Sequence, residues 1–196
     1  MVLPNQLTTL RIILTPVFFF LFLSGDPTYI QISVLVYLIA AITDWYDGWL
    51  ARKFNYITDW GKFMDPLADK ILTTAAFFAF ASIGTIEYWM VWIVVLRDIF
   101  VTSFRIYAEY KKNTIRTSNS AKLKTFLQMI FIYYLLLLSV VKTFPEFYEK
   151  NISLFETLSN HDFIYYAMFF ITVFTAYTAI TYIIQNRAII KRLFSK

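Results

Sequence analysis

Apolar residues are grouped along the chain in long stretches, and short polar connections separate them. Crossing a hydrocarbon layer about 30 Å thick takes ~20 residues of α-helix, with few charges among them. Stretches of this kind occupy residues 7–24, 30–54, 64–83, 87–110, 120–142 and 162–186. The pattern predicts an all-α, polytopic membrane protein with six transmembrane helices.

The connections carry the residues that commonly end or start helices. Ser24-Gly25-Asp26-Pro27 and Gly84 predict turns after the first and third spans. Asp65-Pro66 is expected at the start of the third helix, because proline is tolerated in a first helical turn. The longest connection, 143–161, is expected to hold a short amphipathic helix at 152–158.

Composition agrees with a protein built for a bilayer. Of the 196 residues, 59% are hydrophobic, and the mean hydropathy is +0.57. No polar stretch is long enough to fold by itself, so one membrane domain is expected over 1–196. The absence of cysteine excludes disulfides and thiolate metal sites.

The net charge of +5 does not indicate nucleic-acid binding, because the charges alternate between the connections. One set of connections is strongly basic, and the other is mostly acidic. Basic connections favour the cytoplasmic side, so the pattern predicts six spans with both termini in the cytoplasm. The basic set is Arg52, Lys53, Lys62, Lys111, Lys112, Arg116, Lys122, Lys124, Arg187, Lys191, Arg192 and Lys196. The other set is Asp26, Glu87, Lys142, Glu146, Glu149, Lys150, Glu156 and Asp162.

Four acids stand in or beside the second and third apolar stretches: Asp44, Asp47, Asp65 and Asp69. Ionisable residues in a membrane are costly and indicate function by default. Each pair shares one helix face, since the members are three or four residues apart. The two helices are antiparallel neighbours, so the acidic faces are expected to converge. Hard divalent cations prefer such oxygen ligands, and paired metals suit displacement at phosphorus.

Small and basic residues flank the acids. Gly48, Ala51 and Gly61 allow a helix or a bulky ligand to approach closely. Arg52 follows Asp47 by about one turn and suits bidentate binding of phosphate oxygens.

Two other interpretations of the acids stay open. They could pair with basic residues and hold helices together, although local bases are few. They could also belong to a cation pathway through a small transporter, although their clustering at one end of the spans and the lack of an inverted repeat disfavour this. An inert membrane scaffold leaves the acids unexplained.

The spacing Asp44-x2-Asp47-Gly48-x2-Ala51-Arg52-x8-Gly61-x3-Asp65-x3-Asp69 resembles the complete signature of the CDP-alcohol phosphatidyltransferase family. The resemblance implies attack by an acceptor alcohol on the β-phosphorus of CDP-diacylglycerol, with CMP as the leaving group. It also implies two Mg²⁺ or Mn²⁺ ions held by the four acids, with Asp69 as general base. Gly48, Ala51 and Arg52 would line the CDP pocket, and Thr58 would lie near the diphosphate.

Further charged residues in the fourth and fifth stretches raise the question of the acceptor. Arg97, Asp98 and Arg105 form either an intramembrane ion pair or part of an anion pocket. Lys122 and Lys124 are either ordinary cytoplasmic flanking residues or ligands of a phosphate. An acceptor that is itself a phosphate ester would explain the four bases together.

Residues 4–128 also resemble one branch of the family, on Pro4-Asn5-x-Leu7-Thr8-x2-Arg11, Arg97-Asp98 and Ser120-x-Lys122-x-Lys124-Thr125. That branch uses sn-glycerol 3-phosphate and makes phosphatidylglycerophosphate. The resemblance implies that Asn5 and Thr8 contact CDP-diacylglycerol and that Arg11 contacts phosphate. Arg11 could instead extend its charge toward the interface from an apolar helix.

Other acceptors within the family also stay open, namely phosphatidylglycerol and inositol phosphate. The family is commonly homodimeric, so a homodimer surrounded by membrane lipids is expected. The expected location is a bacterial inner membrane, with the active site on the cytoplasmic side.

Overall fold

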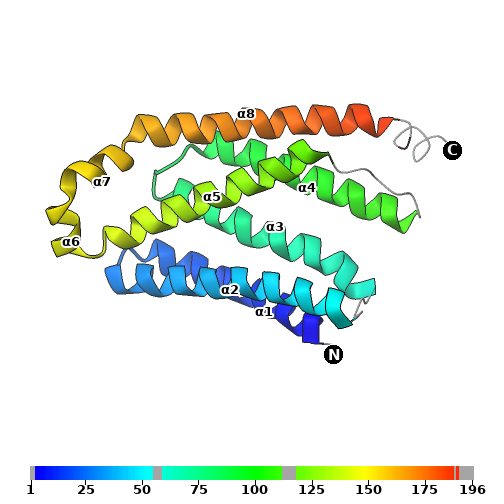
Figure 1. The fold of residues 1–196 in the computed structure, drawn as a ribbon, viewed down its shortest axis with the longest axis horizontal. Coiled ribbons are helices and arrows are strands. Elements are labelled where there is room, and N and C mark those ends of the chain that lie inside the picture. Colours follow the sequence, from blue (N-terminus) through cyan, green and yellow to red (C-terminus); the bar gives the residue numbers. More distant parts are fainter. Residues whose placement is uncertain (1–2, 55–58, 112–117, 188, 190–196) are drawn as a thin grey trace. The chain divides into compact units, whose positions relative to one another are not determined.

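The computed structural model describes residues 3–54, 59–111, 118–187 and 189. The side chains of 3–5, 45, 47, 48, 51, 52, 54, 59–63, 65, 66 and 109 also lie outside the description. Over the described residues the chain is helical and contains no strand (Figure 1). The helices are α1 (Leu3–Leu23), α2 (Pro27–Phe54), α3 (Asp59–Ser82), α4 (Tyr88–Tyr110), α5 (Asn119–Val141), α6 (Pro145–Lys150), α7 (Ile152–Leu158) and α8 (His161–Gln185).

The long helices coincide with the apolar stretches, which confirms the predicted positions of these elements. The short helix expected at 152–158 is α7. The expected start of the third helix at Asp65-Pro66 is wrong, because α3 begins at Asp59 and continues through both residues. A proline inside a helix removes one backbone hydrogen bond, and here it does not end the helix.

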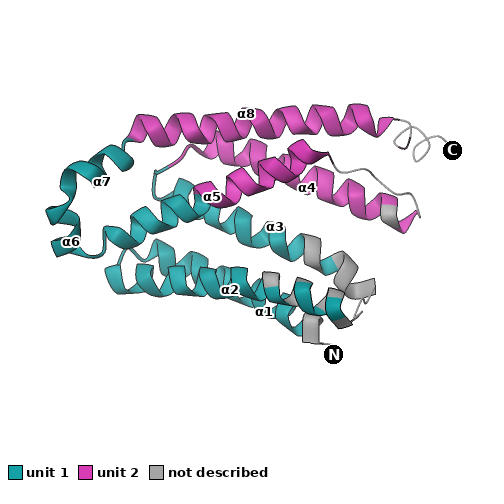
Figure 2. Cartoon of the chain, in the orientation of Figure 1, with its two compact units in different colours: residues 1–85, 132–160 teal, residues 86–131, 161–196 magenta. Residues whose placement is uncertain are grey.

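The chain divides into two compact units, which Figure 2 colours separately. Unit 1 comprises Met1–Thr85 and Ile132–Asn160, and unit 2 comprises Ile86–Phe131 and His161–Lys196. Helix α5 therefore begins in unit 2 and ends in unit 1. The expectation of a single domain over 1–196 stays a prediction.

In unit 1, α1 packs against α2 and α3 through aromatic side chains. The ring of Phe18 lies 5.1 Å from that of Tyr37 on α2, and Phe22 lies 5.1 Å from Phe80 on α3. Ala76 and Ala79 are fully buried on α3. Small residues let membrane helices approach closely, so they bring the acidic ends of α2 and α3 into one bundle.

The turn between α1 and α2 forms as the sequence predicts. Gly25 has φ of 74°, a left-handed conformation that glycine adopts without a steric penalty. The Asp26 carboxylate accepts hydrogen bonds from the backbone N–H groups of Thr28 at 2.8 Å and Tyr29 at 3.3 Å. This N-cap satisfies two donors at the start of α2 and fixes where that helix begins.

In unit 2, α4 packs against α8. Met90, Val91 and Val94 are buried on α4, and Thr172, Thr175 and Thr178 are buried on α8. The hydroxyls of Thr172 and Thr178 donate to backbone carbonyls of their own helix. Both of these hydroxyls are therefore satisfied within α8. Small, satisfied side chains on the buried face of a membrane helix allow close packing against its neighbour.

Many large apolar side chains point outward, as expected for contact with lipid; examples are Phe20, Leu35, Leu137 and Phe170. Four stretches of the described chain are long and apolar enough to cross a membrane: Gln6–Leu23, Pro27–Asp44, Asn119–Val141 and Ile152–Gln185. Helices α3 and α4 are of similar length but carry several charged residues. The protein is therefore an all-helical membrane protein.

Candidate functional site

The first group of site residues lies where α1 and α2 meet in unit 1. Arg11 on α1 is fully buried, and its Nη1 atom lies 2.5 Å from Oδ1 of Asp44 on α2. The Asp44 side chain keeps 39% of its surface exposed. The guanidinium thus contacts the carboxylate from the buried side, while part of the carboxylate surface stays exposed.

This contact corrects one interpretation of Arg11. An arginine that extends its charge toward the interface would have an exposed end, whereas Arg11 is 0% exposed and forms an ion pair. Thr8, three residues earlier on α1, is also fully buried. The hydroxyl of Thr15 donates to the Arg11 carbonyl at 2.8 Å. One face of α1 is therefore polar and turned inward toward the acids.

Asp69 provides the second described carboxylate, on α3. Its side chain is 32% exposed, and Nζ of Lys70 lies 3.2 Å from its Oδ2 atom. The backbone carbonyl of Asp69 accepts a hydrogen bond from the Thr73 hydroxyl at 3.2 Å. Asp69 is therefore accessible, and a lysine next to it partly balances its charge.

Two tyrosines connect the neighbourhoods of Asp44 and Asp69. The rings of Tyr37 on α2 and Tyr133 on α5 lie 6.0 Å apart. Asp69 is close enough to the Tyr37 hydroxyl, and Asp44 to the Tyr133 hydroxyl, for the charge of each acid to act on the phenol. The Tyr37–Tyr133 pair thus lies within reach of the charges of both acids, and no pattern in the sequence indicated it.

The remaining acids are placed only by their helices. Asp47 lies in α2 and Asp65 in α3, so each shares a helix face with a described carboxylate. Their side chains, and those of Asn5, Gly48, Ala51 and Arg52, lie outside the described residues, as does Thr58 altogether. Within the part of the chain that is described, no three acids or histidines gather into a metal-binding group.

The donors that are described fit a divalent cation. Asp44 and Asp69 are half-exposed carboxylates, so an ion can approach their oxygens from outside the bundle. Carboxylate oxygen is the ligand that hard cations such as Mg²⁺ prefer. Arg11 contacts Asp44 and Lys70 contacts Asp69, so each of these two carboxylates has one neighbouring cation.

A second polar group lies inside unit 2. Nζ of Lys124 on α5 lies 2.6 Å and 2.8 Å from the two carboxylate oxygens of Asp98 on α4. Lys124 is 1% exposed and Asp98 is 5% exposed. Lys124 is therefore a buried ion-pair partner, and the interpretation of it as an ordinary flanking lysine is wrong. In the sequence, this ion pair was indicated only by Asp98, an acidic residue within an apolar stretch.

Arg97 adjoins the same carboxylate. Its Nη1 atom donates to Oδ1 of Asp98 at 3.0 Å, and its side chain is 9% exposed. Its Nε and Nη2 atoms are buried and have no hydrogen-bond partner among the described residues. Two cations and one anion leave the group with one net positive charge. Buried N–H donors that have no described partner, within a group of net positive charge, suit the binding of an anion.

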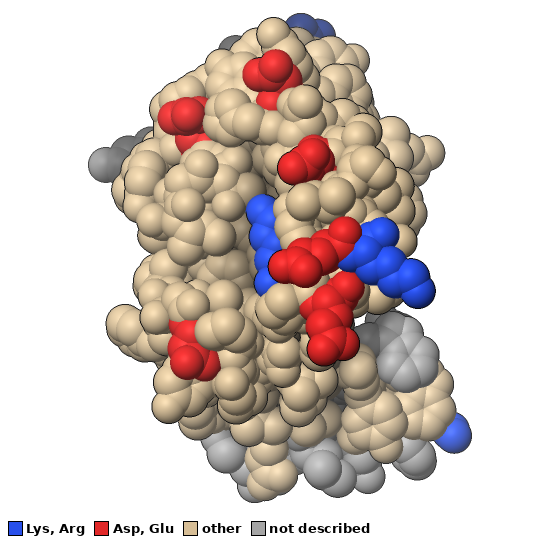
Figure 3. Space-filling model, turned by 90° about the vertical axis from the view of Figure 1, so that its left-hand side faces the viewer, with Lys and Arg blue, Asp and Glu red and all other residues tan. Residues whose placement is uncertain are grey.

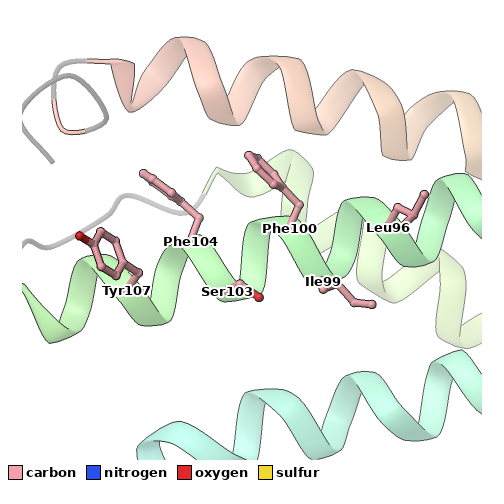
Figure 4. A pocket seen from close by; sticks show the side chains of 6 residues that line it. All are labelled: Leu96, Ile99, Phe100, Ser103, Phe104 and Tyr107. Atoms are coloured by element: carbon pink, nitrogen blue, oxygen red, sulfur yellow. The ribbon is translucent and has the colours of Figure 1, made fainter. Parts of the chain in front are cut away.

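The other two predicted bases differ from Arg97 and Lys124 in exposure. Arg105 on α4 and Lys122 on α5 are both exposed. One face of α4 is largely apolar, and Arg105 is not among the residues that line it. It forms a hollow lined by Leu96, Ile99, Phe100, Ser103, Phe104 and Tyr107 (Figure 4). Phe100 and Phe104 project toward α8, where Phe104 lies 6.2 Å from the ring of Tyr182. This hollow has the lining of a lipid contact, not of an anion site.

Comparison with known proteins identifies the family. A family model described as "CDP-alcohol phosphatidyltransferase" matches residues 1–174. A Bacillus subtilis protein is 35% identical over 147 residues, covering 69% of this chain and 76% of its own length. A Rickettsia typhi protein is 35% identical over 135 residues, with coverage of 69% and 76%. A Salmonella typhimurium protein is 37% identical over 142 residues, with coverage of 68% and 75%.

All three relatives are named CDP-diacylglycerol–glycerol-3-phosphate 3-phosphatidyltransferase. This family is generally dependent on divalent metals, which agrees with the half-exposed carboxylates of Asp44 and Asp69. The comparisons do not favour the transporter and scaffold interpretations. The chain belongs to the CDP-alcohol phosphatidyltransferase family and is a membrane-embedded transferase of phospholipid biosynthesis.

Proposed function

We propose that the protein transfers the phosphatidyl group of CDP-diacylglycerol to sn-glycerol 3-phosphate, giving phosphatidylglycerophosphate and CMP. The observation that carries the proposal is the pair of accessible carboxylates, Asp44 and Asp69, within a chain whose relatives are named for this reaction. Those relatives match over about three quarters of their own length. Phosphatidylglycerol and inositol phosphate are the alternative acceptors.

Asp69 is proposed as the general base. The acceptor hydroxyl is a poor nucleophile, and a carboxylate that removes its proton during attack makes it more effective. The hydroxyl oxygen forms a bond to the β-phosphorus, the bond from that phosphorus to the CMP oxygen breaks, and the proton passes to Asp69. Exposure of about a third of the Asp69 side chain supports this role, because the acceptor must reach it from water.

Asp44, Asp47, Asp65 and Asp69 are proposed to hold the divalent metal, as two Mg²⁺ or Mn²⁺ ions. Bound metal would neutralise the diphosphate and the charge that develops on the departing CMP. Arg11 would hold Asp44 in place from behind, which the 2.5 Å ion pair supports. The protein would thereby keep one metal ligand oriented while 39% of the Asp44 side chain stays exposed.

The nucleotide is proposed to bind beside these acids. Gly48 and Ala51 leave room for it on α2, and Arg52 would contact the diphosphate. Asn5 and Thr58 are retained as contacts on the basis of the family resemblance. Thr8 is fully buried, which favours support of the adjacent Arg11 over direct contact with the ligand.

The acceptor phosphate is proposed to bind Arg97. Its two buried N–H groups without described partners support this assignment. Lys124 is proposed to act indirectly, because both carboxylate oxygens of Asp98 lie within 2.8 Å of its ammonium group. Arg105 and Lys122 remain candidates for guiding the anion, since both are exposed and positively charged.

We also propose six spans, with both termini and the active site on the cytoplasmic side of a bacterial inner membrane. The distribution of charge supports this orientation. Helices α6 and α7 carry Glu146, Glu149 and Glu156, and acidic side chains gather on the face that Figure 3 draws. Connections with few Lys and Arg residues are typical of the outer side. A homodimer, with the later helices at its interface, remains part of the proposal.

The proposed reaction is tested by CMP release from purified protein in detergent. CDP-diacylglycerol and Mg²⁺ are supplied with glycerol 3-phosphate, phosphatidylglycerol or inositol phosphate in separate reactions. Release that depends on glycerol 3-phosphate is the expected result. Release with only another acceptor would overturn the acceptor assignment and leave the metal and base assignments intact. No release with any acceptor would contradict the enzyme function.

A further inference from the structure

An apolar groove of about 450 Å³ runs between α2 and α5 within unit 1. Val34, Leu35 and Leu38 line it from α2, and Leu137 and Val140 are among the residues that line it from α5. These positions follow helical spacing, so each helix presents one continuous face to the groove. The groove is open sideways, since Leu35 is 59% and Leu137 is 63% exposed.

One end of the groove leads toward the carboxylates. Tyr133 lines this end and stands within electrostatic reach of Asp44. Helix α2 rises about 1.5 Å per residue, so Asp44 lies about 9 Å beyond Leu38 along the helix. A lipid whose phosphate sits at Asp44 therefore has a path for one acyl chain past Tyr133 and into the groove.

A polar contact lies at the other end of the groove. The Gln31 side-chain amide donates to the Thr143 hydroxyl at 2.8 Å, and that hydroxyl donates to the Val140 carbonyl at 2.6 Å. Phe144 also lines the groove. Gln31 is about 20 Å from Asp44 along α2. An extended chain that reaches this point meets hydrogen-bonded groups that a methylene cannot replace.

Assuming the function proposed above, we propose that this groove seats one acyl chain of CDP-diacylglycerol and that the Gln31–Thr143 pair sets the chain length at which kcat/KM stops rising. Lipid tails are as apolar as the groove, so seating a methylene gains packing contacts and little hydrophobic free energy. The expected signature is a value of kcat/KM that rises with chain length until the groove is filled and is then constant.

Two variants should shift this chain-length profile in opposite directions. Val140→Trp fills the half of the groove that lies farther from Asp44. With this variant, kcat/KM should become constant at a shorter chain length. The pair Gln31→Leu and Thr143→Val removes both hydrogen-bonding groups together, which avoids an unsatisfied partner. This double variant should move the plateau toward longer chains. Ile39→Trp is the matched control, because Ile39 is a lipid-exposed residue of α2 outside the groove lining.

The experiment measures CMP release in mixed micelles with saturated CDP-diacylglycerols from short to long chains. Each variant is compared with wild type on the same lipid, which cancels differences in lipid partitioning. Val140→Trp should lower the ratio of kcat/KM for long-chain lipid to kcat/KM for short-chain lipid by about fivefold. This effect is smaller than the effect of one methylene in a pocket that is otherwise filled by water, because the excluded part of the chain stays in lipid.

The outcomes separate the two proposals. Unchanged profiles in Val140→Trp and in the double variant would overturn the groove assignment, and the groove would then be a site for an ordinary bilayer lipid. An equal loss on short and long chains would also overturn it, because it would indicate a general packing defect. Absence of CMP release from wild type on every lipid would instead contradict the proposed function.

Discussion

Arg11 and Asp44 form an ion pair whose partners differ sharply in exposure. Nη1 of Arg11 lies 2.5 Å from Oδ1 of Asp44, yet the arginine is fully buried and the aspartate is 39% exposed. A buried charge is costly unless it is paired, so α1 and α2 are held together at this point. The exposed side of the carboxylate remains accessible to a ligand.

Replacing Arg11 should therefore destabilise unit 1. Arg11→Met removes the buried cation, but the half-exposed Asp44 can be hydrated, which reduces the penalty. We expect a loss of about 1–2 kcal/mol in the free energy of unfolding. Thermal unfolding in detergent measures it, with Ile13→Ala as a control on the lipid-facing side of α1. Equal unfolding temperatures for Arg11→Met and wild type would show that the pair contributes no stability.

Asp69→Asn should nearly abolish turnover. The amide cannot accept the acceptor's proton, and loss of a general base typically costs about 10²–10⁴-fold in rate. CDP-diacylglycerol binding should remain measurable by a spin-filter assay with labelled lipid. Asp162→Asn, an exposed aspartate in the first turn of α8, serves as the control and should retain wild-type turnover. Wild-type rates in Asp69→Asn would contradict the assignment of the base.

Removal of divalent metal should stop the reaction. We expect no CMP release after treatment with a chelator and recovery when Mg²⁺ or Mn²⁺ is added back. Asp44→Asn weakens one ligand and should raise the metal concentration for half-maximal rate by at least about tenfold. Titration of the rate against free metal measures this shift. Activity that persists in a chelator would argue that the four acids serve only to hold helices together.

Lys124→Met should destabilise unit 2 strongly. It leaves the buried carboxylate of Asp98 without its main partner, and breaking a buried ion pair costs about 3 kcal/mol or more. The double variant Lys124→Met with Asp98→Asn removes both charges and should recover most of this loss. Lys122→Ala is the control, since Lys122 is exposed two residues away. No recovery in the double variant would mean that the lysine is needed for more than charge balance.

Arg97→Gln should affect the acceptor more than the lipid. The neutral amide cannot replace a guanidinium at a phosphate, so KM for glycerol 3-phosphate should rise about tenfold or more. KM for CDP-diacylglycerol should change little. Steady-state CMP release with each substrate varied in turn measures both constants, and Arg187→Gln is an exposed control in unit 2. Equal increases in both KM values would argue against an acceptor-phosphate site.

Much of the local architecture could be predicted from the sequence, because hydrophobic length and turn residues act locally. The positions of α1, α2, α4, α5 and α8 follow from long stretches that are mostly apolar, and Gly25 with Asp26 determines the first turn. The start of α3 was misjudged, since proline ends a helix only when the surroundings do not stabilise its continuation. The short helix α6 was also missed.

The candidate acids could be found in the sequence because charge in an apolar stretch is rare and their spacing is specific to a family. Their partners could not be found in this way. Arg11 and Asp44 are far apart along the chain, as are Asp98 and Lys124, and a linear pattern does not state which helix faces meet. The Tyr37–Tyr133 pair and the Gln31–Thr143 hydrogen bond could not be predicted for the same reason.

The sequence by itself therefore determined the helical class, the placement of the long helices, the family and the four acids as candidates, since these depend on local hydrophobicity and spacing. Only the tertiary structure decided that Arg11 holds Asp44, that Lys124 is paired with Asp98 and that Arg97 keeps two buried donors without described partners. The physical reason is that ion pairing and burial depend on which side chains the packing of helices brings together.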